Sequence, residues 1–395
     1  MADIVIIGGC GHVGLPLGLA FALAGRSVVA VDIDAEKVAR TNQGVMPFVD
    51  AGADRCLPEV LRKKTFTATT SSDAIRDADT VITVVGTPLD EHLNPRLEVY
   101  SDLIRRDRSR LRDGQLLVLR STVYPGTTDQ VAHALERAGF DLDVAFCPER
   151  VAEGVALEEI HSLPQIVSGT TPRAERRAAD LFGLLTPDVI GLPTMAAELT
   201  KLYNNAWRYI QFAVANQFYM IANDCGLDFH EIHRAMTEKY PRARGFPRAG
   251  FAAGPCLFKD TMQLATFNNN AFFLGHSAML VNEGLPNYLV RRVTSRYDLR
   301  EMTVGILGMT FKADSDDPRD SLSFKLRKCL VFEAKEVLCA DPYLDRPWIL
   351  PAEEVVERSG LLFVGAPHRA YKALDMRGKT VIDVWNSVPG GVSVV

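Results

Sequence analysis

The chain has 395 residues, which is long enough for two or three domains with substantial hydrophobic cores. Hydrophobic residues make up 47% and charged residues 24% of the sequence, proportions that are ordinary for a globular protein. The formal net charge of −5 excludes the strongly basic surface that binding to nucleic acid or to an anionic membrane would require.

Cysteine usage and hydropathy indicate where such a chain works. The seven cysteines are scattered without a C-x-x-C pair or a zinc-ligand spacing, and their odd number argues against a disulfide framework. The first residues lack the basic and apolar regions of a signal peptide, and no apolar run approaches the roughly 20 residues of a membrane span. We therefore expect a cytoplasmic protein that binds neither nucleic acid nor membrane.

The first predicted elements form a strand, a glycine-rich turn and a helix. Residues 4–7 are a run of β-branched residues typical of a buried strand, and residues 15–24 have the composition of a helix. The pattern G-x-G-x-x-G lies between them. In a dinucleotide site Gly9 permits the tight turn, Gly11 lets the pyrophosphate approach the backbone, and Gly14 lets the helix pack on the strand.

The second predicted strand, residues 27–31, supplies the acidic end of the same fingerprint. Asp32 follows it and can bind the adenosine ribose hydroxyls, which favours NAD over NADP. Lys37 could reach the adenosine side or be a solvated helix residue. We expect NAD to contact the turn and this acid at Gly9, Gly11, His12, Val13, Gly14 and Asp32.

Three further strands, expected over residues 80–85, 116–119 and 144–146, each end in small or polar residues. Ligands of open α/β sheets bind outside the carboxyl ends of the strands. The side chains that such a ligand would meet are Thr87, Thr122, Glu149 and Glu153. Each alone would be an ordinary turn or cap residue, but together they predict a binding rim.

Residues 194–225 contain neither Gly nor Pro and predict a helix of about 30 residues, roughly 45 Å long. A helix of this length usually bridges domains or forms a subunit interface, so we expect a homodimer built on it. Lys201 and Asn205 are four residues apart and therefore share one face of this helix.

A loop rich in Gly, Ala and Pro precedes a helix that begins near Cys256. Unpaired N–H groups and the positive end of the helix dipole favour a thiolate there. Lys259 and Asp260 follow at spacings that share a helix face. The alternative is that Cys256 is a small buried hydrophobe. The arginines upstream, which suit a diphosphate, are Arg242, Arg244 and Arg248.

The last third repeats the alternation of strands and helices without the full glycine fingerprint, which predicts a second doubly wound domain. Its strands are expected over residues 302–307, 336–340, 360–364 and 379–384. The acidic stretch 314–320 lacks the spacing and the glycine of a calcium loop, so we predict no metal. We interpret it as a loop that orients Lys312 and Arg319.

A nicotinamide site and an activated thiol in one chain suit oxidation at the aldehyde level. The thiolate adds to a carbonyl to give a thiohemiacetal, hydride loss to NAD gives a thioester, and water releases the acid. The second nucleotide-binding domain suggests that the carbonyl carrier is itself a nucleotide.

The chain resembles, from end to end, the UDP-glucose/GDP-mannose 6-dehydrogenases, which oxidise C6 of a nucleotide sugar twice with NAD. The motifs that carry the resemblance are G-x-G-H-V-G-L-P at residues 9–16, S-T-V at 121–123, C-P-E at 147–149, K-x-x-x-N at 201–205, C-x-x-K-D at 256–260, F-K-x-D at 311–314 with Arg319, and D-P-Y at 341–343.

The resemblance implies a role for each site residue. Cys256 would be the nucleophile, Lys201 and Asp260 with Asn205 would hold the water and stabilise oxyanions, and Glu149 would activate the water near Thr122. The implied cofactor contacts beyond the turn are Lys37, Thr87, Thr122, Glu153, Lys259 and Arg319. The implied substrate contacts are Glu149, Arg150, Lys201, Asn205, Arg242, Arg244, Phe246, Arg248, Gly254, Phe311 and Lys312, with one arginine from a neighbouring subunit.

Two departures from the family pattern bear on the sugar. The usual glycine run before the nucleophile is here F-A-A-G at residues 251–254. Arg150 stands where UDP-glucose enzymes typically carry an aromatic residue, so the chain is more similar to the branch that oxidises UDP-N-acetylhexosamines. The run L-P-Q-I-V at 163–167 favours the same branch.

The predicted fold is α/β, with two Rossmann-like doubly wound domains joined by a long central helix and an all-α dimerisation region. We expect an NAD-binding domain over residues 1–192, a helical dimerisation domain over 193–297 and a nucleotide-sugar domain over 298–395. Two other functions remain open: a two-electron hydroxyacid dehydrogenase, which also has a Rossmann domain followed by a long helix, and a non-catalytic NAD-binding protein.

Overall fold

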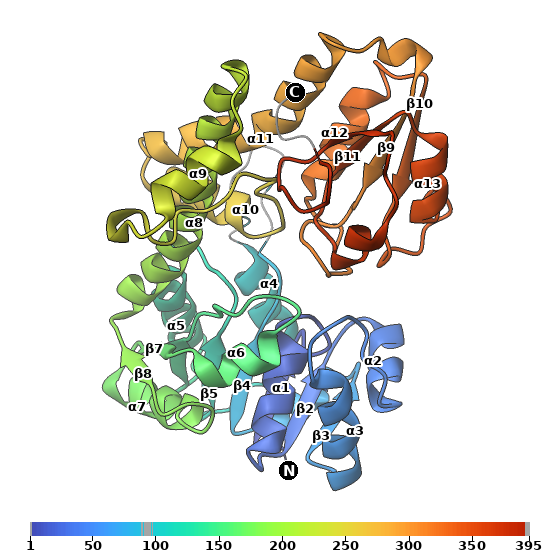
Figure 1. Ribbon diagram of the computed structural model, residues 1–395. Helices are drawn as coiled ribbons and strands as arrows, with labels where there is room; N and C mark the ends of the chain where they lie inside the picture. Colours follow the sequence, from blue (N-terminus) through green and yellow to red (C-terminus); the bar gives the residue numbers. More distant parts are fainter. Residues whose placement is uncertain (1, 88–89, 91–95, 97, 392–395) are drawn as a thin grey trace. The chain divides into compact units, whose positions relative to one another are not determined.

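The protein is described here by a computed structural model that covers residues 2–87, 90, 96 and 98–391. The chain divides into two compact units, Met1–Tyr203 and Asn204–Val395. Each unit contains one β-sheet covered by helices (Figure 1). The predicted division into three domains stays a prediction.

The first unit is built on an eight-stranded sheet with the order β3-β2-β1-β4-β5-β6-β7-β8. The strands from β3 to β6 are parallel, β7 is antiparallel to β6, and β8 is parallel to β7. The order of the first six strands is that of dinucleotide-binding domains. The strand bounds are β1 Ile4–Ile7, β2 Val28–Val31, β3 Phe66–Thr69, β4 Thr80–Thr83, β5 Leu116–Leu119, β6 Asp143–Phe146, β7 Gln165–Gly169 and β8 Val189–Gly191.

Both faces of this sheet are covered, because side chains alternate along each strand. Ile4 and Ile6 join the core under one set of helices, whereas Val5 and Ile7 join the core on the opposite face. The first face packs on α1 Gly14–Leu23, α2 Ala35–Asn42, α3 Ala53–Lys63, α6 Ala156–Ser162 and α7 Pro172–Phe182. The second face packs on η1 Ser72–Asp77, α4 Glu98–Asp107 and α5 Thr127–Arg137, with η2 Arg108–Arg110 after α4.

The long helix α8 spans Thr194–Asp224, which confirms the helix expected from the absence of Gly and Pro. A buried carboxylate in its second turn, Glu198, fixes the start of α8 to the first unit. Glu198 accepts hydrogen bonds from the N–H groups of Gly126 (2.5 Å) and Thr128 (2.9 Å) and from the Thr128 hydroxyl (2.5 Å). Burial raises the pKa of Glu198. This residue therefore serves as the cap of α5 while belonging to α8.

The helical part of the second unit packs around α8 through buried polar pairs. Asn216 donates to the Oδ1 atom of Asn282 (2.9 Å), and Asn223 donates to the hydroxyl of Tyr288 (3.1 Å). Such fully buried amides fix the register of the two helices because an unpaired amide would be costly. The other helices here are α9 Phe229–Thr237, η3 Pro241–Ala243, α10 Leu257–Phe267 and α11 Phe273–Thr294.

The second sheet has four parallel strands in the order β10-β9-β11-β12. Its bounds are β9 Thr303–Leu307, β10 Glu336–Ala340, β11 Leu361–Val364 and β12 Thr380–Ile382, with α12 Leu322–Leu330 packed on one face, α13 Ala352–Arg358 on the other, and η4 Leu299–Glu301 and η5 Arg369–Ala373 in the connections. The predicted α/β fold with two Rossmann-like doubly wound domains and a long central helix is confirmed. Among the described residues, the search for a helix long and apolar enough to cross a bilayer finds none.

Candidate active site

The glycine-rich turn of the first unit has the shape that a dinucleotide requires. A Cβ added at Gly9 would lie 2.7 Å from the Cβ of Ala30, and one at Gly14 would lie 2.4 Å from the carbonyl oxygen of Gly8. Both positions therefore exclude any side chain. A Cβ at Gly11 would meet only that same carbonyl, at 3.6 Å, so this side of the turn leaves room for a ligand. These are the three roles that the fingerprint assigns to its glycines.

Asp32 is tied to the same turn. Its Oδ2 atom accepts the N–H of Cys10 (3.0 Å) and its Oδ1 atom accepts the N–H of Asp34 (3.1 Å), which holds the half-buried carboxylate at the end of β2. No side chain caps the N-terminus of α1, whose N–H groups can thus bind phosphate oxygens. The turn, the helix start and this acid together fit NAD.

Two of the other predicted cofactor contacts, His12 and Lys37, have partners within the protein. The imidazole of His12 stacks on Phe48 with ring centroids 4.2 Å apart. Lys37 forms a solvent-exposed ion pair with Asp34 at 3.7 Å, within the first turn of α2. Val13 is the residue immediately before α1. Their contact with the cofactor stays a prediction.

The predicted binding rim is formed by neighbouring strands. Thr87 follows β4 and Thr122 follows β5, and the hydroxyl of Thr87 donates to the carbonyl oxygen of Thr122 at 2.7 Å. The structure therefore brings these two sequence-predicted residues together. Glu153 is half-buried in the loop between β6 and α6.

Glu149 lies after β6 in a buried ion pair with Arg120, a partner that sequence analysis did not predict. Both Nε (3.0 Å) and Nη2 (2.5 Å) of Arg120 donate to its Oε2 atom, while the N–H groups of Arg150 (2.7 Å) and Val151 (3.0 Å) donate to Oε1. The Arg120 side chain is fully buried and lies 4.7 Å above the ring of Phe182. Arg120 immediately precedes the S-T-V motif, but only the fold shows that it reaches Glu149.

Arg150 turns toward the connection that precedes β7. Its guanidinium donates to the carbonyl oxygen of Pro164, in the segment that also suggested the N-acetylhexosamine branch. Burial lowers the pKa of Arg150, and the charge of Arg120 lowers it further. The side chain is thus a positioned, partly desolvated cation rather than a free surface arginine.

Cys256 lies at the N-cap position of α10, and its side chain is exposed. This excludes the alternative of a buried hydrophobe. Four residues on, the fully buried Asp260 accepts from Nδ2 of Asn205 (2.5 Å) and pairs with Nζ of Lys259 (3.0 Å). Asn205 belongs to α8, on the face that also carries the half-buried Lys201 one turn earlier. A thiol at a helix start thus lies on the same helix turn as an oriented carboxylate.

The loop before Cys256 is held by hydrogen bonds to α8 and to the loop that follows β9. The N–H of Gly250 donates to Oδ1 of Asn216 on α8 (2.9 Å), and the N–H of Gly254 donates to the carbonyl oxygen of Asp320 (3.3 Å). Gly254 has φ of 102°, and a Cβ there would lie 2.6 Å from the ring of Phe311. The structure therefore brings the predicted residues Gly254 and Phe311 together.

The arginine segment is arranged differently from the rest. Arg242 donates to the hydroxyl of Tyr240 (2.7 Å) and stacks on its ring, and Arg244 and Arg248 are exposed. The ring of Phe246 packs between Phe218 and His233 within the helical layer. Substrate binding by this segment stays a prediction.

In the acidic stretch after β9, an ion pair with Asp317 orients Arg319, as expected, whereas the orientation of the Lys312 side chain stays a prediction. Asp317 accepts from Nε (2.9 Å) and Nη2 (2.6 Å) of Arg319, and its own carbonyl oxygen accepts the N–H of Phe311 (3.0 Å). The carbonyl oxygen of Lys312 accepts from the hydroxyl of Thr310 (3.1 Å). The loop therefore folds back on itself around Lys312.

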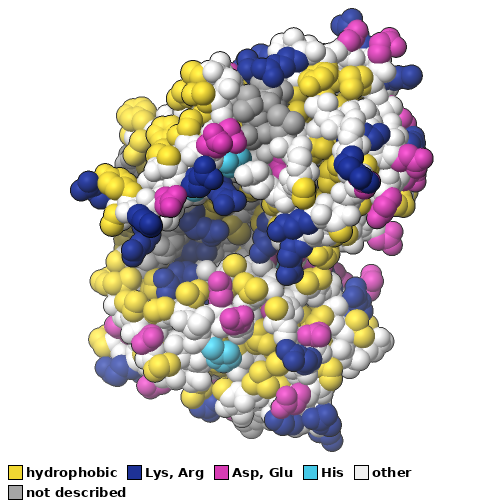
Figure 2. All heavy atoms as spheres, viewed as in Figure 1, with side chains coloured by type: hydrophobic (Ala, Val, Ile, Leu, Met, Phe, Trp, Pro, Cys, Tyr) yellow, Lys and Arg dark blue, Asp and Glu magenta, His cyan; other side chains and the backbone are white. Residues whose placement is uncertain are grey.

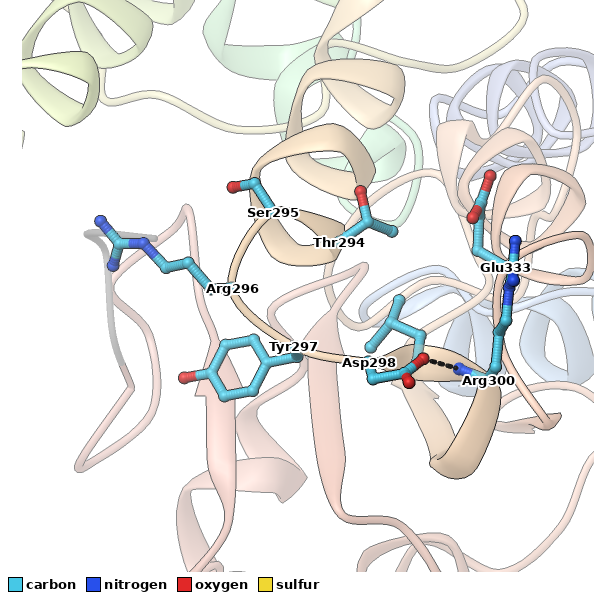
Figure 3. A pocket seen from close by; sticks show the side chains of 8 residues that line it. Thr294, Ser295, Arg296, Tyr297, Asp298, Arg300 and Glu333 are labelled. Atoms are coloured by element: carbon cyan, nitrogen blue, oxygen red, sulfur yellow. Dashed lines mark hydrogen bonds between the residues drawn. The ribbon is translucent and has the colours of Figure 1, made fainter.

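A separate surface cavity of about 430 Å³ lies where α11 ends (Figure 3). Its lining is mostly polar and includes Ser295, Tyr297, Asp298, Arg300 and Glu333, with Asp298 accepting from the N–H of Arg300. No residue predicted for catalysis or binding lines it.

A strand order of 3-2-1-4-5-6, a glycine turn shaped for pyrophosphate and an acid on the second strand define an NAD-binding α/β dehydrogenase. Three domain models of one family match the chain: the NAD binding domain at residues 2–185, the central domain at 195–283 and the UDP binding domain at 305–389. The chain belongs to the UDP-glucose/GDP-mannose dehydrogenase family. The predicted NAD-dependent oxidation of a nucleotide sugar is thereby confirmed.

Individual relatives align over nearly the whole chain. A UDP-N-acetyl-D-mannosamine dehydrogenase of Pyrococcus horikoshii is 29% identical over 96% of this chain and 94% of its own. An NDP-N-acetyl-D-galactosaminuronic acid dehydrogenase of Ralstonia nicotianae is 28% identical over 95% of this chain and 94% of its own. The solved structure of the UDP-D-ManNAc dehydrogenase from Pyrococcus horikoshii superposes with a TM-score of 0.91 and 28% identity, covering 99% of this chain and 97% of that one.

Proposed function

We propose that the protein oxidises C6 of a UDP-hexose from alcohol to carboxylate, with a UDP-N-acetylhexosamine such as the GlcNAc or ManNAc derivative preferred over UDP-glucose. The names of the similar relatives, which act on N-acetylated sugars, support this preference. So does Arg150, which bonds the carbonyl of Pro164 and replaces the aromatic residue expected of UDP-glucose enzymes.

The observation that carries the proposal is the exposed thiol of Cys256 at the start of α10, one helical turn from the buried Asp260. After the first oxidation, the thiolate would add to the C6 aldehyde and form a thiohemiacetal. Hydride loss from that carbon would give a thioester, and water would cleave the C–S bond to release the carboxylate and the thiol. NAD, when bound, accepts one hydride in each oxidation.

The remaining residues would orient water and charge around that carbon. Lys201 and Asp260 with Asn205 would hold the water and stabilise the oxyanions, and the 2.5 Å bond between Asn205 and Asp260 fixes the carboxylate for this task. Glu149 would activate the hydrolytic water near Thr122. Because Arg120 and two N–H groups occupy both of its oxygens, it would accept a proton only by giving up one of these bonds.

The proposed contacts fall into two groups, one for NAD and one for the nucleotide sugar. The residues that would hold NAD are Gly9, Gly11, His12, Val13, Gly14, Asp32, Lys37, Thr87, Thr122, Glu153, Lys259 and Arg319. Lys312, Phe311 and Gly254 would contact the nucleotide sugar, and one of the arginines 242, 244 and 248 would bind its diphosphate, from the neighbouring subunit. The contact between Gly254 and Phe311 supports a shared site for these two.

We also infer a homodimer formed through α8. Hydrophobic side chains stay exposed along one face of this helix at helical spacing, including Trp207 (60% exposed), Phe218 (40%) and Ile221 (53%). Figure 2 shows hydrophobic side chains gathered over the helices α8 and α9. We place the enzyme in the cytoplasm, in line with the buried free thiols Cys10, Cys147 and Cys339.

The decisive experiment measures NADH formed per substrate over a panel of UDP- and GDP-sugars. We expect two NADH per UDP-N-acetylhexosamine, a lower kcat/KM for UDP-glucose, and a Cys256→Ser variant that stalls after little turnover. Cys225→Ser, which changes an exposed cysteine after α8, should behave like the wild type. A yield of one NADH, or activity only with free hydroxyacids, would overturn the assignment.

A further inference from the structure

Three loops of the second sheet meet at one buried side chain, His368. These loops follow β9, β10 and β11, which are neighbouring parallel strands, so their carboxyl ends share one edge of the sheet. His368 itself follows β11 and is 1% exposed. All of these loops fall within residues 305–389, which match the UDP binding domain of the family.

We propose that His368 is a positioning residue for nucleotide-sugar binding, acting by fixing the backbone on both sides of Lys312. The proposal rests on the proposed function, in which Lys312 contacts the nucleotide sugar. It adds a residue from β11's loop that does not itself touch substrate.

The hydrogen bonds of His368 define its tautomer. Nδ1 lies 2.9 Å from the backbone nitrogen of Asp314, whose N–H can only donate, so Nδ1 carries no proton. The proton of the neutral ring is therefore on Nε2, which lies 3.2 Å from Oδ2 of Asp341 and 3.1 Å from Oγ1 of Thr310. Nδ1 thus accepts a hydrogen bond, whereas Nε2 donates.

Both roles converge on Lys312. On one side, Thr310 accepts a hydrogen bond from Nε2–H of His368 and donates its own hydroxyl to the carbonyl oxygen of Lys312 at 3.1 Å. On the other side, Nδ1 holds Asp314, whose φ of 53° is in the left-handed region that non-glycine residues avoid without support. His368 therefore fixes the residue two before and the residue two after the lysine.

Asp341 completes the arrangement. Its Oδ2 atom also accepts the N–H groups of Met309 (2.7 Å) and Thr310 (2.9 Å), so the same carboxylate anchors the start of the Lys312 loop and the imidazole. Burial alone would raise the pKa of Asp341, but the hydrogen bond from His368 and the backbone donors lower it. A fixed anion beneath His368 keeps the proton on Nε2.

Two near-isosteric substitutions of His368 each keep the hydrogen bonding of one ring nitrogen and remove that of the other. In His368→Gln the amide reaches the position of Nε2 and cannot accept from Asp314, whereas in His368→Asn the amide oxygen replaces Nδ1. We expect His368→Gln to raise KM for the UDP-sugar about tenfold and His368→Asn to raise it about threefold, since each loses a different bond. KM for NAD should stay within about twofold in both. An unchanged KM for the UDP-sugar in His368→Gln would overturn the proposal.

Tyr371→Phe is the matched control for loss of stability. Tyr371 packs against His368, and its hydroxyl donates to the carbonyl oxygen of Ala340 (3.1 Å), so the variant also removes a buried hydrogen bond beside β10. We expect it to lower the melting temperature by an amount similar to His368→Gln while leaving KM for the UDP-sugar unchanged. A KM raised equally in both variants would show a merely structural role and would also overturn the proposal.

A double-mutant cycle tests whether the effect passes through the lysine. In a Lys312→Met background, His368→Gln should add less than about twofold to KM, because the group that it positions is gone. Full additivity of the two effects would contradict this. Failure of the proposed function is distinguishable, since the wild type would then oxidise no UDP-sugar, whereas failure of this inference leaves wild-type turnover intact.

Discussion

Cys256 differs from the other cysteines of the chain in its place in the fold. Burial raises the pKa of the Cys10 and Cys339 thiols to about 11 and that of Cys147 to about 12, so these thiols are unreactive near neutral pH. Cys256 is exposed at a helix start. Burial therefore distinguishes the exposed Cys256 from three inert thiols.

Cys225 provides an internal comparison for the thiol of Cys256. Both are exposed, but Cys225 directly follows the C-terminus of α8, at the negative end of that helix dipole, whereas Cys256 lies at the positive end of the dipole of α10. We expect iodoacetamide at pH 7 to alkylate Cys256 about tenfold faster than Cys225, measured by peptide mass spectrometry. Equal rates at the two cysteines would show that the start of α10 does not activate its thiol.

Strands and helices could be predicted from the sequence where the amino-acid composition of a segment suffices to identify its secondary structure. The apolar runs of β1 and β5 and the uninterrupted helix α8 were predicted because no Gly, Pro or polar run interrupts them. The strand β3 was not predicted because every second residue of Phe66–Thr69 is a threonine, so the segment contains no apolar run. The strand β8 was not predicted because it is only three residues long.

The parts of the site that escaped prediction are contacts between distant residues. The glycine turn and the C-x-x-K-D helix are local patterns, so they could be recognised. Arg120 meets Glu149, Asn216 meets Gly250 and His368 meets Asp314 across 29, 34 and 54 residues. Such partners depend on how the layers pack, which no local pattern encodes.

A substitution in the loop that leads to α10 tests whether this loop positions Cys256. Gly254→Ala should lower the free energy of unfolding by about 1–3 kcal/mol and slow turnover, because the residue has φ of 102° and its Cβ would meet Phe311. Gly378→Ala is the control, since Gly378 has φ of 78° but nothing within 4 Å. Chemical denaturation and kcat of both variants would separate strain from displacement of Cys256, and equal losses of kcat would contradict the argument.

The proposed dimer depends on the exposed face of a single helix, α8. Trp207→Glu would place a charge in the interface along α8, so the variant should elute as a monomer in size-exclusion chromatography with light scattering. Phe332→Glu replaces an even more exposed aromatic residue that follows α12 and should leave the mass unchanged. A monomeric wild type would refute the dimer outright.

For the whole molecule, acid sensitivity should depend on carboxylates that are buried in ion pairs. Asp143 on β6 is 1% exposed and pairs with Arg173 (2.8 Å) and Arg177 (2.8 Å). Burial alone would raise the pKa of Asp143, but these two arginines lower it. A depressed pKa in the folded state contributes stability above the unfolded value near 4, and this contribution is lost as the pH falls below it.

Asp143→Asn should therefore lower the free energy of unfolding by about 1–3 kcal/mol at pH 7, measured in urea, and the difference from the wild type should shrink below about pH 4. Asp375→Asn is the control, because the exposed pair with Arg377 lowers the pKa of Asp375 to about 2 but is screened by solvent. We expect no measurable change in that variant. A difference that grows toward low pH would contradict the sign of the argument.

The tight approach of Gly9 to β2 also limits which amino acids natural variation can place there. Because a Cβ at Gly9 would already collide with that of Ala30, a larger side chain at residue 30 would press on the turn from the opposite side. In a saturation library, position 30 should accept only glycine, alanine or serine, because Ala30 is fully buried against the turn. The adjacent Val29, which points to the other face, should tolerate isoleucine and threonine.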